Sequence, residues 1–117
     1  MRTEKVIVIG EDDKQIIERR FRAAGYDVVS AATRESALAL ARREAHAKAV
    51  VLCQGSLINV AETVLNLRDL CPSIKVIVVL QRGTRQSNRF LRQLIDHPIE
   101  GSEIMTRREL QRHLQTA

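Results

Sequence analysis

Short runs of β-branched and other aliphatic residues recur along the chain, with little alternation of apolar and polar positions inside them. Runs of this kind are typical of strands that are buried on both faces of a sheet. They predict four clear strands and a weaker fifth, which we expect around Ile104 within Glu100–Met105. The four clear strands are expected at Val6–Ile9, Tyr26–Ala31, Ala49–Cys53 and Val76–Leu80.

The segments between these runs carry apolar residues three and four positions apart, which is the period of an amphipathic helix. Helices are therefore expected at about 13–24, 34–46, 59–70, 86–95 and 107–114. Thr33 suits an N-cap, and Thr106 with Glu109 has the spacing of a capping box. The apolar face of the first helix consists of Ile16, Ile17, Phe21 and Ala24.

A strand followed by a helix, five times over, predicts an α/β fold with a doubly wound parallel sheet and helices on both faces. No repeat, low-complexity tract or linker interrupts the pattern. Residues 1–117 are therefore expected to form a single domain, which could be the N-terminal domain of a longer regulator.

The composition favours a cytoplasmic protein with an aliphatic core and a basic surface. Aromatic residues make up only 3% of the chain, which argues against base stacking on single-stranded nucleic acid. The formal net charge of +5 suits either an anionic partner or a mildly basic solvated surface. Two cysteines and no apolar run of signal-peptide or transmembrane character indicate a reducing compartment with free thiols, and no membrane partner.

In an open parallel sheet, ligands bind beyond the carboxyl ends of the strands. A dinucleotide site there would need three glycines after the first strand, but only Gly10 is present, with Asp12 and Gln15 at the other two positions. The acidic residues Glu11, Asp12 and Asp13 instead follow this strand. Glu11 and Asp12 are candidate Mg²⁺ ligands, and the alternative is that an aspartate caps the first helix. No other cofactor is expected.

Several segments of the chain resemble the CheY-like receiver domain of response regulators. Val6 to Asp13 is similar to the first strand and acidic pair of that family, and Gly25 to Ala32 is similar to its Gly-Tyr-x-Val-x-x-Ala segment. The residues Glu35-Ser36-Ala37-Leu38 are similar to the helix that follows. The resemblance covers nearly the whole chain and implies a (βα)5 fold with the strand order 2-1-3-4-5.

The phosphorylation chemistry of receivers does not carry over to this sequence. The resemblance places a phosphoacceptor aspartate where Cys53 stands, a switch threonine or serine where Leu80 stands, and a lysine near Arg107. Glu11 and Asp12 match the acidic pair. The chain is therefore expected to be a pseudo-receiver that is neither phosphorylated nor an enzyme. The alternative is a Mg²⁺-dependent receiver that is phosphorylated at an unusual site, such as Glu11, Asp12 or Asp13.

Other reactive residues offer weaker hypotheses. Cys53 could serve as a redox-sensitive thiol, although a small buried core residue is the simpler interpretation. The histidines His46, His97 and His113 lack metal-ligand spacing, and His46 and His113 suit helix C-termini. No catalytic triad is apparent.

Arginines gather on two predicted helix faces. Arg85, Arg89 and Arg92 share one face of the fourth helix, while Arg108 and Arg112 share a face of the last helix. The resemblance implies docking and dimerisation on the surface of the fourth helix, fifth strand and fifth helix. We expect a protein partner or a second copy to bind there, in signal transduction or transcription regulation. Direct nucleic-acid binding is the alternative, which the lack of a helix-turn-helix pattern disfavours, and a small-molecule-binding α/β domain is a further one.

Overall fold

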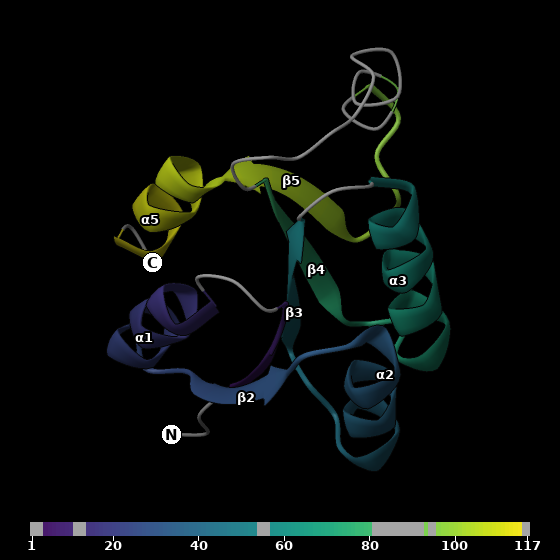
Figure 1. Ribbon diagram of the computed structural model, residues 1–117, viewed down its shortest axis with the longest axis horizontal. Helices are drawn as coiled ribbons and strands as arrows, with labels where there is room; N and C mark the ends of the chain where they lie inside the picture. The colour runs from purple at the N-terminus through teal and green to yellow at the C-terminus, as the bar shows by residue number, and fades with distance from the viewer. Residues whose placement is uncertain (1–3, 11–13, 54–56, 81–92, 94–95, 116–117) are drawn as a thin grey trace.

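The computed structural model describes residues 4–10, 14–53, 57–80, 93 and 96–115, and contains a single five-stranded sheet (Figure 1). The strands are β1 Lys5–Ile9, β2 Asp27–Ala31, β3 Lys48–Cys53, β4 Lys75–Leu80 and β5 Ser102–Thr106. The helices are α1 Lys14–Ala23, α2 Arg34–Arg43, α3 Leu57–Leu70 and α5 Arg107–Gln115. The helix expected over 86–95 falls almost entirely on residues outside the described set.

All neighbouring strands are parallel, and their order is β2-β1-β3-β4-β5. Helices α1 and α5 cover one face of the sheet, while α2 and α3 cover the other (Figure 1). The doubly wound α/β fold and its strand order are therefore confirmed. None of the described helices is long and apolar enough to cross a membrane.

The side chains of each strand alternate between two apolar layers. On β1, Ile7 and Ile9 pack in the layer under α2 and α3, whereas Val6 and Val8 pack under α1 and α5. Phe21 of α1 is fully buried in the second layer. Because the sheet is covered on both faces, every interior strand position must be apolar, which explains the continuous valine and isoleucine runs.

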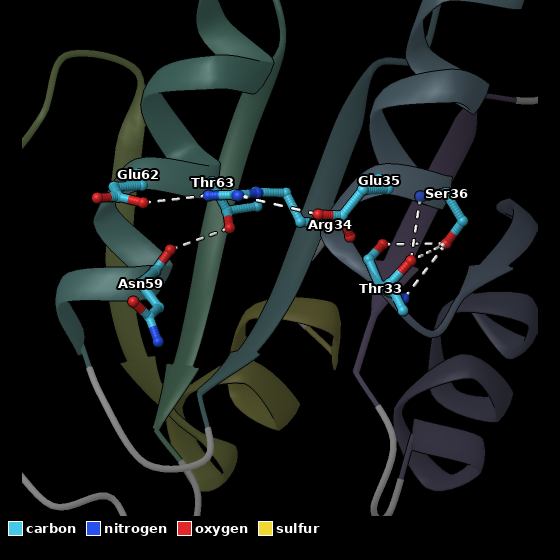
Figure 2. A network of polar contacts seen from close by, with 7 residues as sticks. All are labelled: Thr33, Arg34, Glu35, Ser36, Asn59, Glu62 and Thr63. Atoms are coloured by element: carbon cyan, nitrogen blue, oxygen red, sulfur yellow. Dashed lines mark hydrogen bonds and ion pairs between the residues drawn. The ribbon is translucent and has the colours of Figure 1, made fainter.

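The expected helix caps are present at two helix starts. At α2, the Thr33 hydroxyl accepts a hydrogen bond from the Ser36 amide, and the Ser36 hydroxyl accepts one from the Thr33 amide (Figure 2). At α5, Thr106 and Glu109 form the predicted reciprocal box, with distances of 3.1 and 3.3 Å. Each box satisfies backbone amides that have no partner within the helix.

The second helix is shorter than predicted. It ends at Arg43, and Glu44 is an extended C-cap residue, so the expectation that the helix runs to His46 is wrong. His46 lies in the connection to β3, where it is buried and its Nδ1 is 2.9 Å from the Glu44 carbonyl oxygen. Burial of this side chain by tertiary packing, rather than helix geometry, fixes its position.

An ion pair of 3.1 Å between Arg34 and Glu62 links α2 to α3 (Figure 2).

Candidate functional site

The candidate site lies at the carboxyl ends of β3, β4 and β5, which the register brings side by side. Cys53 is the register partner of Leu80, and Leu80 is the partner of Thr106. Arg107 follows directly as the first residue of α5. The structure therefore brings together three positions that the resemblance had assigned to one pocket, namely Cys53, Leu80 and Arg107. Glu11 and Asp12 follow β1 but belong to the part of the chain that is not described.

Leu80 places an aliphatic side chain at the end of β4. It is partly buried and packs against the apolar layer that lies under α2 and α3. A leucine offers neither a hydroxyl nor a charge, so the side chain at this strand end cannot hydrogen-bond to an anion. The alternating layers of the sheet explain its packing, because Leu80 follows Val76 and Val78 on the same face.

Thr106 carries the hydroxyl at the end of β5, next to Leu80. Its Oγ1 accepts a hydrogen bond from the Glu109 amide, and it is exposed. The hydroxyl is therefore engaged in starting α5. Arg107 is half-buried beside it and carries a guanidinium in the place where the resemblance expects a lysine.

Gly10 connects β1 to the acidic residues, and its role was not predicted from the sequence. Its amide donates to the Ala31 carbonyl at 3.0 Å, so pairing with β2 continues past the end of β1. Its φ is +154°, and a Cβ there would lie 2.9 Å from Cβ of Leu52. Glycine is thus required by the close approach of Leu52, a long-range contact that leaves no local signal in the sequence.

Charged groups near the described strand ends are few. No cluster of three or more histidine, cysteine, aspartate or glutamate side chains that could hold a metal ion occurs among the residues that are described. Among the described residues, shifted pKa values occur near the amino-terminal end of β1, where the hydrogen bond between Lys5 and Glu44 raises the pKa of Lys5 and lowers that of Glu44. The Mg²⁺ hypothesis for Glu11 and Asp12 stays a prediction.

The expected arginine surface is described only in part. Arg108 and Arg112 are exposed on α5. Arg85, Arg89 and Arg92 lie outside the described residues, so that part of the expected surface stays a prediction. His97 and His113 are exposed, while His46 is buried.

Comparison of the structure with solved structures identifies the fold. A CheY-like response-regulator receiver domain from Methanospirillum hungatei superimposes with a TM-score of 0.70 and 19% sequence identity, covering 98% of this chain and 93% of that one. The chain has the receiver fold. The receiver domain of a sensor histidine kinase from Pseudomonas aeruginosa, solved with a magnesium ion in its active-site cleft, gives 0.69 at 19% identity, with 98% and 97% covered.

The receiver fold also occurs in a neighbour with a different name. The pilus assembly protein CpaE from Caulobacter crescentus matches with a TM-score of 0.66 at 15% identity, covering 96% of this chain and 91% of that one. No protein-family model matches the sequence, and no curated protein matches it. At these identities the likeness concerns the receiver fold alone, and the chemistry must be argued from the residues of this chain.

Proposed function

We propose that this domain is a phosphorylation-independent interaction module of a signalling or transcription-regulating protein, built on the receiver fold. The observation that carries the proposal is the register at the sheet edge, where Cys53, Leu80 and Thr106 stand side by side. These residues occupy the strand ends from which a receiver would hold and sense a phosphoryl group. The proposed role is therefore non-catalytic, and the domain would act by binding a partner in the cytoplasm.

The strand-end residues support this proposal chemically. Formation of an acyl phosphate requires a carboxylate, and none of the five described strands ends in one. Their last residues are Ile9, Ala31, Cys53, Leu80 and Thr106. Leu80 has no hydroxyl that could follow a phosphoryl group, and a switch needs contacts that differ between two states. A partner would instead recognise one fixed conformation of the domain.

The structural neighbours are compatible with this function without selecting it. One neighbour holds magnesium in an active-site cleft, whereas another is named a pilus assembly protein. The same fold thus occurs in proteins that are named for different roles, so the fold by itself does not imply phosphotransfer. Whether this domain accepts a phosphoryl group or only binds a partner therefore depends on the residues at its strand ends.

The partner surface that we propose includes β5 and α5, where Arg108 and Arg112 are exposed. Arg85, Arg89 and Arg92 would extend it. A protein partner or a second copy of the domain would dock there. Direct contact with nucleic acid or a membrane is not part of the proposal.

A titration followed by amide NMR tests the proposed function. Mg²⁺ is added first, and beryllofluoride, a mimic of a phosphoryl group, is added second. We expect the NMR signals of the Cys53, Leu80 and Thr106 amides to keep their positions in both steps. If these signals shift and the shifts saturate as ligand is added, the domain is a working receiver with an unusual site.

The second candidate function is that Mg²⁺-dependent receiver, phosphorylated at Glu11, Asp12 or Asp13. It is favoured by the acidic run that directly follows Gly10 and by the magnesium ion in one neighbour. Replacement of Glu11 and Asp12 by asparagine or glutamine would then abolish the Mg²⁺ response. The proposed interaction module predicts no response to abolish.

A further inference from the structure

Helices α1 and α5 lie side by side on one face of the sheet (Figure 1). An open groove of about 290 Å³ lies between their C-terminal halves. Ala23 at the end of α1, Ala24 directly after it and Leu114 of α5 give it apolar walls, and the lining is completed by Arg20, Gln111 and Gln115. This groove lies toward the amino-terminal edge of the sheet, away from the strand ends of the candidate site.

The groove continues over the outer surface of α1 as a second hollow, which Ile16, Arg19, Arg20 and Ala23 line. These residues are three and four positions apart and so form one stripe along the helix. Ile16 is 39% exposed, whereas its neighbour Ile17 is buried in the core. Ile16, Ala23 and Ala24 are thus exposed apolar residues along α1 and just beyond its end, and the half-buried Leu114 borders the two alanines.

The charge along this stripe has one sign. Neither hollow is lined by an acidic residue. The single carboxylate of α1, Glu18, is only 6% exposed and lies under the helix. Arginines near a helix C-terminus are favoured by the helix dipole alone, but that effect does not account for exposed Ile16 beside them. The combination of an apolar floor and a guanidinium rim calls for an amphipathic, acidic occupant.

We propose that the groove between α1 and α5 binds an acidic amphipathic helix of a partner protein. The inference rests on the proposed function and adds a second docking surface, separate from the one on β5 and α5, with the chemistry of the segment that it binds. A trough between two adjacent helices accepts the ridge of a third. From Ile16 to Ala23 the stripe is about 10 Å long, or two helical turns. Small aliphatic side chains of the partner would face Ala23 and Leu114, while its carboxylates would accept paired hydrogen bonds from Arg19 and Arg20.

The test uses a synthetic helix of about 15 residues, with leucine and alanine on one face and glutamate on both flanks. A second peptide carries lysine in place of every glutamate. Binding is followed by amide NMR and by fluorescence anisotropy. We expect the glutamate peptide to shift amides of α1 and α5 around Ala23 and Leu114, and the lysine peptide to bind at least tenfold more weakly.

Charge reversal provides the matched variants. Arg19→Glu with Arg20→Glu should weaken the glutamate peptide at least tenfold and improve binding of the lysine peptide. Arg19→Glu alone changes only an exposed side chain and should leave the core intact, so it tests the charge effect without a change in folding. Arg42→Glu with Arg43→Glu is the control, because these exposed arginines also end a helix but lie on α2, at the opposite face of the sheet.

Several outcomes would overturn the proposal. Equal affinity for both peptides, shifts confined to the Arg108 and Arg112 surface, or an equal loss in the α2 control would each do so. Self-association of the domain that Arg19→Glu abolishes, without peptide binding, would assign the groove to a second copy instead. None of these results touches the Mg²⁺ and beryllofluoride titration, so failure of this inference and failure of the proposed function remain distinguishable.

Discussion

Leu52 of β3 packs directly over Gly10, so that a Cβ at Gly10 would come within 2.9 Å of Cβ of Leu52. This contact ties the segment after β1 to the end of β3, the two places from which a receiver-like site is built. The backbone of Gly10 still pairs with Ala31 of β2. Any residue that is larger than glycine must push β1 away from β3 or displace Leu52.

We therefore expect Gly10→Ala to destabilise the domain by roughly 1–3 kcal/mol, the range for overpacking a well-filled core. Gly25→Ala is the matched control, because Gly25 also has a positive φ, +96°, but no atom lies within 4 Å of a Cβ built there. Backbone strain alone should cost Gly25→Ala about 1 kcal/mol. Urea denaturation of the three proteins measures the difference, and equal losses would show that the Leu52 contact relaxes freely.

The capping box at α5 gives a second prediction. Thr106→Ala removes the acceptor of the Glu109 amide and should lower the free energy of unfolding by about 1 kcal/mol. Thr106→Ser keeps the hydroxyl and should cost a small fraction of that. Thermal or urea unfolding would separate the two, and an equal loss from both variants would point to the methyl group of Thr106 instead of its cap.

A third prediction concerns pH and the exposed ion pair between Lys5 and Glu44. The hydrogen bond from Lys5 lowers the pKa of Glu44 below its ordinary value of 4.5. A carboxyl with a lowered folded pKa stabilises the fold above its unfolded pKa, and this contribution is lost as the pH falls through the folded pKa. Stability should therefore decline less on acidification in Glu44→Gln than in the wild type.

Salt provides the control for that measurement. Both side chains are exposed to solvent, so the difference between wild type and Glu44→Gln should shrink at high ionic strength. Urea midpoints measured from neutral pH to below 4.5, in low and high salt, test both statements. An identical acid limb in the two proteins at low salt would contradict them.

The fold could be predicted from the sequence because each buried strand leaves a local signature. The continuous valine and isoleucine runs located β1, β3 and β4, and each strand begins one residue earlier than predicted, at Lys5, Lys48 and Lys75. Lysine at a strand start carries no apolar signal, so the boundary could not be read. The end of α2 was misplaced for a related reason, since the burial of His46 depends on tertiary packing.

The candidate site could be predicted in part, from the residue at the end of each predicted strand. Cys53, Leu80 and Arg107 could be placed together because parallel strands end at one edge. The groove between α1 and α5 could not be predicted from the sequence, since helical periodicity grouped Ile16 and Ala24 with Ile17 and Phe21 as one apolar face. In the structure Ile16 and Ala24 are exposed, and Glu18 takes a buried position beside Ile17 and Phe21. Which exposed stripe borders another helix is a property of packing between α1 and α5.

The last prediction introduces, at two strand ends, the residue types that a phosphorylation site would need. Cys53→Asp combined with Leu80→Thr places a carboxylate and a hydroxyl at strand ends that are register partners. Together with Glu11 and Asp12 the new carboxylate would supply the few oxygen ligands that Mg²⁺ takes alongside water. We expect this variant to gain saturable Mg²⁺-dependent and beryllofluoride-dependent shifts at residues 53, 80 and 106, which the wild type lacks. Cys53→Asn with Leu80→Thr has the same shape without the charge and should gain none. A folded aspartate variant that stays silent would mean that the scaffold, and not only these two residues, has departed from a phosphorylation site.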